Sequence, residues 1–353
     1  MPQGHTIDGA LAAWPEVAGL HEWRALFLGN GLSSHVWGKF AYASLFEQAT
    51  TARSPTLGSA DRVLFKAYGT ENFETVLGNL STAIQTNEAL SEDCERLYER
   101  YFSVQRALGA AVRRAHILRA EVPDETLHTI KKVISRQRAV FTTSYDLILY
   151  WAMGYPLRLE DDFWPMADCF WFDGNAFNCP PTIWPDRVPV WFPHGALHLV
   201  ESAGVTRKLV RRPDATLLDQ FGAPLAGDRH ARPLLITEGS WRDKLRAIEA
   251  NSYLNWALEQ LRGCDRPMVV FGSSLGEQDK HLVNALNEHP ERSIAISIRP
   301  KGGRSKIRAQ QAEFRGRLET SELYFYDSTT YPLGAPGLTA RRVFDFMRHR
   351  TAA

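Results

Sequence analysis

Short apolar runs that end in turns of small residues alternate with amphipathic segments along most of this chain. Residues 24–28, 139–143 and 268–271 are such runs, and glycine, serine or threonine lies at or just after the end of each. Buried strands that alternate with helices are typical of a parallel sheet covered on both faces, because each parallel crossover needs a helix. The sequence therefore predicts an α/β fold with a Rossmann-like parallel sheet.

Further elements follow from the same two periodicities. Apolar residues spaced by three and four predict helices over residues 72–83 and 87–120. Other helices are expected at 147–153, 241–262, 277–288, 305–317 and from about 338, and other strands at 233–237, 294–298 and 323–326.

We expect a single α/β domain over residues 1–353 that carries two insertions. A helical insertion is expected over about 50–135, and a small aromatic-rich lobe over about 160–230. Within that lobe, tryptophan and phenylalanine crowd among prolines and glycines over 163–192, which favours short strands and packed loops over a helix. These rings either line a pocket or belong to the core.

The charge balance bears on the kinds of partner. Lys and Arg together number 41 against 40 Asp and Glu, which gives a formal net charge of +1. A chain so balanced has no overall field that would collect nucleic acid or an anionic membrane, so we expect neither partner.

Four cysteines, Cys94, Cys169, Cys179 and Cys264, form no CxxC pair, so no zinc ribbon or dithiol motif is present and no metal is expected. The first twenty residues lack the basic start and apolar core of a secretory signal. No stretch approaches the roughly 20 apolar residues that span a bilayer. We therefore expect a cytoplasmic protein with reduced thiols.

The first candidate motif is the turn GNGLSS at residues 29–34, directly after the first strand. Glycines at such a turn let backbone N–H groups approach a diphosphate, and the following helix adds a favourable dipole. Ser34 stands where the GxGxxG fingerprint has its third glycine, which disfavours an ordinary Rossmann dehydrogenase. A tight strand-to-helix turn is the alternative.

The second motif, FTTSYD at residues 141–146, lies at the carboxyl end of the next strand, where open α/β sheets bind ligands. Its hydroxyl and carboxylate groups suit a polar ligand. Alternatively, Thr143 or Ser144 caps the following helix, with Asp146 in its first turn.

The third motif, WFPHG at residues 191–195, holds His194 between proline and glycine. Its imidazole titrates near neutral pH and suits a general base, although a structural histidine is the alternative. His198 follows four residues later, but Pro193 and Gly195 argue against the helix that a metal-binding pair would need.

The fourth motif, GSSLGEQD at residues 272–279, follows a further buried strand. It offers serine hydroxyls and backbone N–H groups to a second side of a nucleotide cleft, or else Ser273 or Ser274 simply caps a helix. The segment also matches the nucleophile elbow GxSxG, with Ser274 as nucleophile, but only His281, His289 and His349 follow it, in or near expected helices.

Taken in this order, the four motifs resemble those of the sirtuin-like NAD-binding superfamily. Within it they look like bacterial sirtuin-like domains of anti-phage defence, which hydrolyse NAD rather than deacylate proteins. GNGLS is similar to that family's GAGxS, TTSYD to TTNYD, PHG to LHG and GSSLGEQD to GxSLxDxD. The resemblance covers about residues 24–300, and the missing zinc ribbon favours NAD cleavage over deacylation.

The resemblance implies NAD as substrate and a role for each motif. His194 would be the general base, Ser144 would orient the ribose and Asp146 would fix its loop. The residues that would bind NAD are Gly29, Asn30, Gly31 and Ser33 at the diphosphate, Thr143, and Gly272, Ser273 and Leu275 on the adenosine side.

One departure leaves two functions open. Ser144 stands where the family has asparagine, and serine keeps a donor and an acceptor but lacks the reach of the amide. The first hypothesis is an NAD glycohydrolase; the alternative is a catalytically weak or silent sensor of NAD or ADP-ribose. The resemblance also implies a homo-oligomer and a phage-derived or defence-system protein as trigger.

Overall fold

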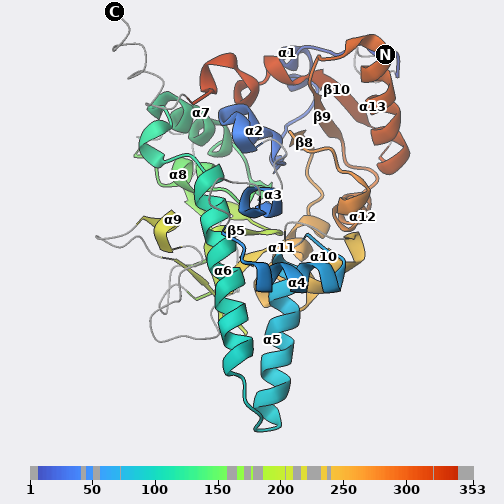
Figure 1. Ribbon diagram of the computed structural model, residues 1–353. Helices are drawn as coiled ribbons and strands as arrows, with labels where there is room; N and C mark the ends of the chain where they lie inside the picture. The colour runs from blue at the N-terminus through green and yellow to red at the C-terminus, as the bar shows by residue number, and fades with distance from the viewer. Residues whose placement is uncertain are drawn as a thin grey trace, which may run out of the picture.

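The computed structural model describes residues 7–40, 45–50, 56–71, 73–156, 165–170, 176–177, 186–202, 204–209, 216–220, 232–236, 240–320 and 322–340. In this part of the chain a seven-stranded parallel sheet forms the centre, with strand order β10-β9-β8-β1-β2-β4-β3 (Figure 1). Its strands are β1 (Ala25–Leu28), β2 (Ala139–Thr142), β3 (Met166–Ala167), β4 (Val188–Trp191), β8 (Met268–Phe271), β9 (Ile294–Ile298) and β10 (Leu323–Asp327).

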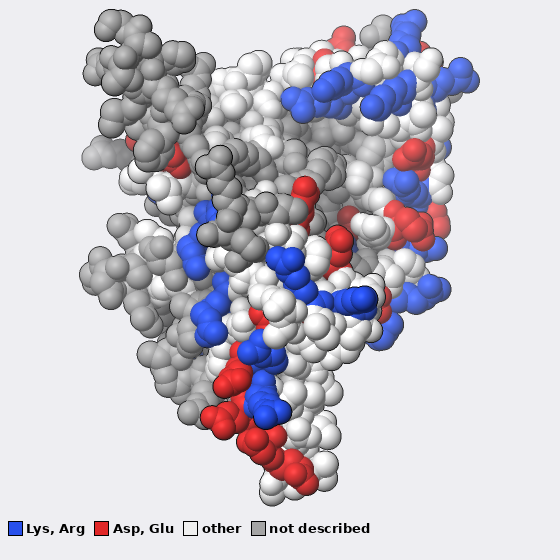
Figure 2. Space-filling view, in the orientation of Figure 1, with Lys and Arg blue, Asp and Glu red and all other residues white. Residues whose placement is uncertain are grey.

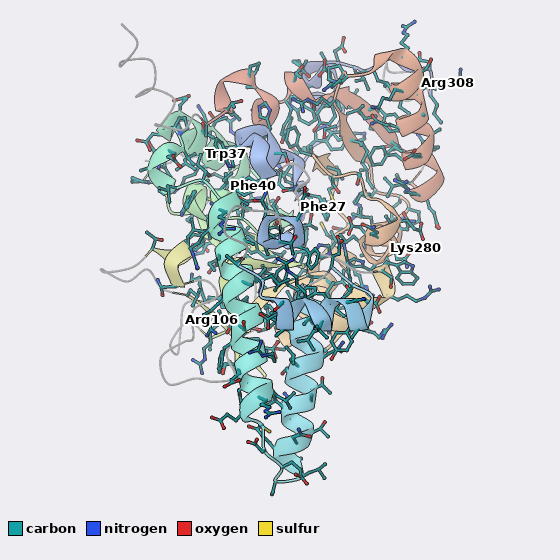
Figure 3. All side chains as sticks on the ribbon, viewed as in Figure 1. Phe27, Trp37, Phe40, Arg106, Lys280 and Arg308 are labelled. Carbon is teal, nitrogen blue, oxygen red and sulfur yellow. The ribbon has the colours of Figure 1, made fainter. Side chains whose placement is uncertain are left out.

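The sheet is covered by helices on both faces, as the sequence predicts (Figure 1). Every residue of β1, β2, β4 and β8 is buried, which explains why these strands are continuous apolar runs. Phe27, near the centre of the molecule in Figure 3, has no exposed surface. The covering helices include α2 (Gly31–Val36), α7 (Asp124–Ile134), α8 (Ile148–Met153), α12 (Lys280–Asn287) and α13 (Gly303–Arg317).

The strand order reverses direction at the middle of the sheet. From β1 the chain moves outward to β2 and on to β3 at the edge of the sheet, with β4 then placed between β2 and β3. It then returns to β8 on the other side of β1. In open parallel sheets, ligands bind outside the carboxyl ends of the strands at such a reversal. The fold therefore directs attention to the loops that follow β1 and β8.

Four helices between β1 and β2 supply most of a second apolar cluster, to which Phe65, Phe73, Tyr101 and Leu108 belong and which extends to residues of the small sheet described below. Two of them make a hairpin that projects from the rest of the molecule (Figure 1). Acidic side chains gather towards its free end in Figure 2. The helices are α3 (Leu45–Thr50), α4 (Ser59–Tyr68), α5 (Phe73–Ala89) and α6 (Glu95–Ala115).

A small antiparallel sheet follows β4, with strand order β6-β5-β7. Trp191, at the end of β4, lies in the core, with its ring 4.4 Å from that of Trp256, whereas much of 163–192 falls outside the described residues. The small sheet consists of β5 (Gly195–Ser202), β6 (Val205–Lys208) and β7 (Arg232–Leu235), with α9 (Leu217–Gln220) beside it.

Two expected helices are interrupted. The helical prediction over 87–120 was wrong at its start, because the chain turns at Ser91, whose φ is 59°. The single helix expected over 241–262 is two, α10 (Trp241–Glu249) and α11 (Ser252–Arg262), because the side chain of Asn251 caps the second. The helix expected from about 338 lies mainly outside the described residues. No described helix is long and apolar enough to cross a membrane.

Candidate functional site at the carboxyl edge of the sheet

The four sequence motifs follow four adjacent strands. GNGLSS follows β1, GSSLGEQD follows β8, TTSYD begins at the last residue of β2, and PHG comes just after β4. Because these strands are parallel, their carboxyl ends meet at one edge, and the four motifs lie there in the order β8, β1, β2, β4.

The loops after β1 and β8 are in direct backbone contact. The N–H of Gly29 donates to Phe271 O at 2.9 Å, and the N–H of Gly31 donates to Gly272 O at 2.7 Å. A Cβ on Gly31 would lie 2.4 Å from the Cα of Gly272, and Gly272 has a φ of +68°. Glycine is therefore required at this contact for space as well as for backbone conformation.

These contacts change the expectation for the GNGLSS loop. The amides of Gly29 and Gly31 are used inside the protein, so they are not available to a ligand. The amides of Asn30 and Ser33 have no acceptor among the described residues. Asn30 also donates its side-chain amide to Phe40 O at 3.1 Å, which fixes the loop against the segment after α2.

A buried hydroxyl and carboxylate cluster joins the loops after β1 and β2. Ser33 donates to the carboxylate of Asp146, and its Oγ lies 3.0 Å from Ser144 Oγ. A hydroxyl has one proton, so Ser144 is the donor in the contact between the two serines. The structure thus brings Ser33, Ser144 and Asp146 together, all with less than a tenth of their surface exposed.

Asp146, rather than Thr143 or Ser144, accepts a backbone amide at the start of α8: Ile148 N–H donates to its Oδ1 at 2.8 Å. The N–H of Thr143 donates to Leu28 O at 2.9 Å, which holds the loop against β1. His116, from the segment after α6, accepts Leu147 N–H at its Nε2, at 3.0 Å. Burial lowers the pKa of His116, although Asp146 opposes the shift, so the imidazole is a neutral acceptor there.

His194 contacts a residue that the sequence analysis did not select. Its Nε2 lies 2.8 Å from the Nε2 of His281 in the first turn of α12. Beside the pair, Lys244 Nζ from α10 lies 2.9 Å from the carboxylate of Asp279. Leu197 N–H donates to Tyr145 O at 2.8 Å, which ties the segment after His194 to the TTSYD loop.

Both imidazoles of this pair are uncharged at neutral pH. Burial lowers the pKa of His194 well below its usual value, and His281 and Lys244 add to the effect. Burial also lowers the pKa of His281 to about 4, with Asp279 opposing. The Nδ1 of His281 is buried without a described partner, a position that suits a lone pair better than an N–H. We infer that His281 donates from Nε2 and His194 accepts.

The nucleophile-elbow interpretation of the loop after β8 does not fit its geometry. The non-glycine residue with a positive φ in this loop is Leu275, at 44°, and not Ser274, whereas the nucleophile of an elbow lies on the strained turn itself. Leu275 N–H donates to Ser273 Oγ at 3.2 Å, and Arg317 donates to Ser274 O at 3.1 Å. The described histidines after the loop are already paired, His281 with His194 and His289 with a carboxylate.

No local signal identified His281 or Lys244 as site residues. Asp279 is the last residue of the fourth motif and His281 lies two positions after it, but the contacts of both with other segments are determined by the tertiary fold. No cluster of three or more His, Cys, Asp or Glu side chains suitable for a metal occurs in the described part of the chain.

The model of a family described as a domain of unknown function, DUF4917, matches residues 26–332. The chain belongs to the DUF4917 family. The DUF4917 match begins inside β1 and ends beyond β10, so it includes all four loops of the carboxyl edge. No curated protein matches the sequence.

Proposed function

We propose that this protein is an NAD glycohydrolase that cleaves NAD to nicotinamide and ADP-ribose, related to the sirtuin-like superfamily. One observation carries the proposal: four motifs that resemble that superfamily's lie on adjacent loops around the reversal of strand order. In open parallel sheets a dinucleotide binds across the carboxyl ends of the strands, so loops on adjacent strands contact both of its halves.

In this proposal the amides of Asn30 and Ser33 bind the diphosphate, because they are the amides of the loop without an internal acceptor. Gly272, Ser273 and Leu275 border the adenosine side, next to the close contact with Gly31. Thr143 and Ser144 face the ribose of the nicotinamide half, and Asp146 holds Ser33 and the start of α8 in place.

The reaction breaks the bond between nicotinamide and C1 of its ribose, through an oxocarbenium-like centre. Water adds at that carbon, and its proton goes to a base. Neutral His194 fits this role, because an uncharged imidazole can accept a proton. Because its pKa is low, His194 is a weak base. In this proposal a bound substrate therefore displaces His281 or otherwise raises the pKa of His194.

A second candidate is a catalytically weak or silent sensor of NAD or ADP-ribose. Two observations favour it. Ser144 replaces the asparagine of the related motif, and the Nε2 of His194 is already hydrogen-bonded to His281. In both candidates the resemblance favours a cytoplasmic, homo-oligomeric protein of anti-phage defence that responds to a phage-derived or defence-system protein.

NAD consumption by the purified protein, followed by chromatography of nicotinamide and ADP-ribose, tests the first candidate. We expect His194→Ala to lower turnover by about 10²–10⁴-fold, as loss of a positioned base does. His289→Ala is the matched control, since His289 is at the surface beside Glu291. Full turnover in His194→Ala would remove His194 from the mechanism.

Ser144→Asn separates the two candidates. A large gain in turnover would mean that the pocket is intact and only attenuated by serine. NAD binding in calorimetry without turnover, in both the natural chain and Ser144→Asn, would establish the sensor. Absence of both binding and turnover would refute the relation to NAD.

A further inference from the structure

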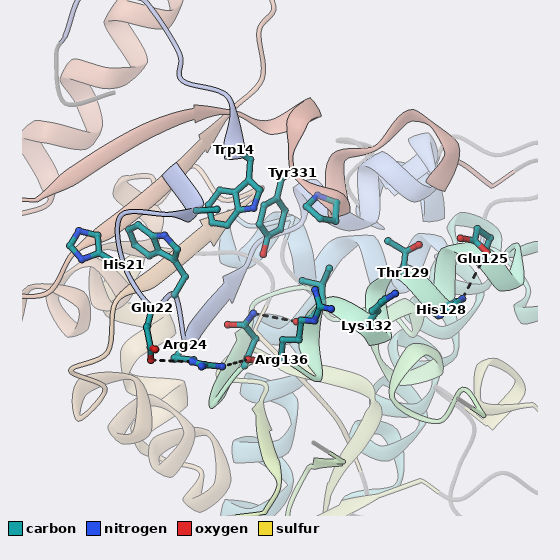
Figure 4. Close-up of a pocket in the computed structure, with 15 residues that line it drawn as sticks. Trp14, His21, Glu22, Arg24, Glu125, His128, Thr129, Lys132, Arg136 and Tyr331 are labelled. Carbon is teal, nitrogen blue, oxygen red and sulfur yellow. Dashed lines mark hydrogen bonds and ion pairs between the residues drawn. The ribbon is translucent and has the colours of Figure 1, made fainter. Parts of the chain in front are cut away.

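A cavity of about 520 Å³ lies beside α7 at the amino ends of β1 and β2, and the carboxyl-edge motifs take no part in its lining (Figure 4). The segment from Trp14 to Arg24 forms one wall, and the cavity-facing residues of α7 form the opposite wall. Arg136 and Gln137, directly before β2, complete the lining on one side, and Tyr331 and Pro332 complete it on another. The volume is within the range of about 300–1,000 Å³ that small-molecule sites have.

Aromatic rings form one side of this cavity. Trp14 and Tyr331 lie next to each other in Figure 4, with ring centroids 4.6 Å apart in an edge-to-face contact. Trp23 extends the wall, 6.3 Å from Trp14. Such rings offer flat apolar surface against which another ring can pack.

The polar groups that remain open towards the cavity are mostly donors. Lys132 Nζ, Trp14 Nε1 and the hydroxyl of Tyr331 have no hydrogen-bond or ion-pair partner among the described residues. Burial raises the pKa of Tyr331, so its hydroxyl stays protonated. Of the lining carboxylates, Glu22 lies 3.5 Å from the guanidinium of Arg24, and Glu125 lies 3.9 Å from the imidazole of His128.

Two further features of the lining limit the chemical class of ligand that fits the cavity. Lys132 and Arg136 both line the cavity one helical turn apart, which suits an anion of two charges such as a phosphate monoester. On the aromatic side, Trp14 Nε1–H and the Tyr331 hydroxyl are both donors, so a ring that carries acceptor atoms would complement them.

We propose that this cavity binds a nucleoside monophosphate, with its base against Trp14 and Tyr331 and its phosphate at Lys132 and Arg136. The proposal is independent of NAD cleavage at the carboxyl edge. Binding requires both the ring and the phosphate, because the aromatic surface and the ammonium group of Lys132 lie on opposite sides of the same cavity.

Isothermal titration calorimetry of the full chain with AMP tests this. We expect saturable binding, at least tenfold tighter than that of adenosine or inorganic phosphate alone. Lys132→Ala should weaken AMP binding at least tenfold, because it removes a hydrogen-bond donor that carries charge. Lys66→Ala, an exposed lysine of α4, is the matched control and should bind AMP like the natural chain. Unchanged affinity in Lys132→Ala would refute the site.

Hydrogen exchange separates this cavity from the carboxyl edge, where AMP could also bind as half of a dinucleotide. We expect AMP to slow exchange in α7 and in residues 14–24. Protection confined to residues 29–34 and 272–276 would overturn the cavity proposal and would instead support the nucleotide site at the carboxyl edge. Lys132 is exposed and makes no described hydrogen bond or ion pair, so the Lys132→Ala variant should fold normally.

Discussion

Single glycines determine how closely the loops of the carboxyl edge approach one another. At Gly195, the first residue of β5, a Cβ would lie 2.0 Å from Leu234 O, and φ is +72°. Gly31 and Gly272 contact each other in the same way across β1 and β8. Any side chain at these positions would push apart the loops that the proposed NAD site needs together.

Gly272→Ala should therefore destabilise the protein. The positive φ and the overlap with Gly31, whose Cα would be 2.7 Å from the new Cβ, together predict a loss of about 2–4 kcal/mol in the free energy of unfolding. Urea denaturation measures it. Gly276→Ala is the control: its φ is −68° and its Cβ would only approach Ser274 Oγ at 3.6 Å, so a similar loss there would contradict the argument.

Buried histidines should make the free energy of unfolding depend on pH. Burial lowers the pKa of His198 to about 3 and of His281 to about 4, and it lowers those of His116 and His194 as well. Below about pH 6.5 the unfolded chain therefore binds more protons than the folded chain. The free energy of unfolding should decrease as the pH is lowered from about 6.5 to about 4.

Each such histidine should contribute a slope of about 1 kcal/mol per pH unit between pH 6.5 and pH 5. His198→Phe isolates one of them, because both ring nitrogens of His198 lack described partners and its ring packs against Tyr150 and Phe192. Urea denaturation between pH 5 and pH 8 should show a slope lower by about that amount. An identical slope in the variant would show that His198 does not titrate on unfolding.

At the level of the elements, the side chain of Asn251 joins the junction of α10 and α11 to the small sheet. Asn251 Oδ1 accepts the amides of Tyr253 at 3.1 Å and Leu254 at 3.0 Å. Its Nδ2 donates to Thr206 Oγ1 at 3.0 Å and to Glu201 at 3.2 Å, on β6 and β5. One side chain thus caps the start of α11 and attaches it to the small sheet.

Asn251→Ala should lower the free energy of unfolding by about 2–3 kcal/mol, since it removes a cap and leaves buried groups without partners. Ser240→Ala removes the exposed cap of α10 and serves as the comparison, with an expected loss of about 1 kcal/mol. Thermal or urea denaturation of both variants is the measurement. Equal losses would mean that the bonds of Asn251 to the sheet contribute nothing.

At this scale the sequence predicts strands better than helix breaks. The strands of the parallel sheet are buried on both faces, so composition alone marks them. The break at Asn251 depends on Thr206 and Glu201, some fifty positions away, and no local pattern contains that information. Likewise, β7 is predicted as a strand, but its place beside β5 rather than in the parallel sheet is a tertiary property.

The same distinction holds for the candidate site: the sequence predicts the individual loops but not which loops contact one another. Each loop is recognisable from its own residues, because a strand that ends in glycine or hydroxyl residues is a local pattern. Which loops become neighbours is determined by the strand order, so the contacts of Ser33 with Asp146 and of His194 with His281 were not predictable. The use of the Gly29 and Gly31 amides inside the protein was missed for this reason.

At the scale of the whole molecule, charge is distributed unevenly despite its overall balance. Acidic side chains, among them Glu92 and Glu95, lie at the free end of the α5–α6 hairpin. Basic side chains of α13, among them Lys306 and Arg308, gather at the other end of the view in Figure 2. Homo-oligomer formation remains a prediction of the resemblance.

The strand order also has a consequence for the time course of synthesis. β1 is the first strand to leave the ribosome, yet its two neighbours are β2 and β8, so its hydrogen bonding is incomplete until residue 271 has been made. Such distant pairing is slow, because long loops must close before the contacts form. During that interval an apolar strand has an open edge, which exposes the nascent chain to aggregation.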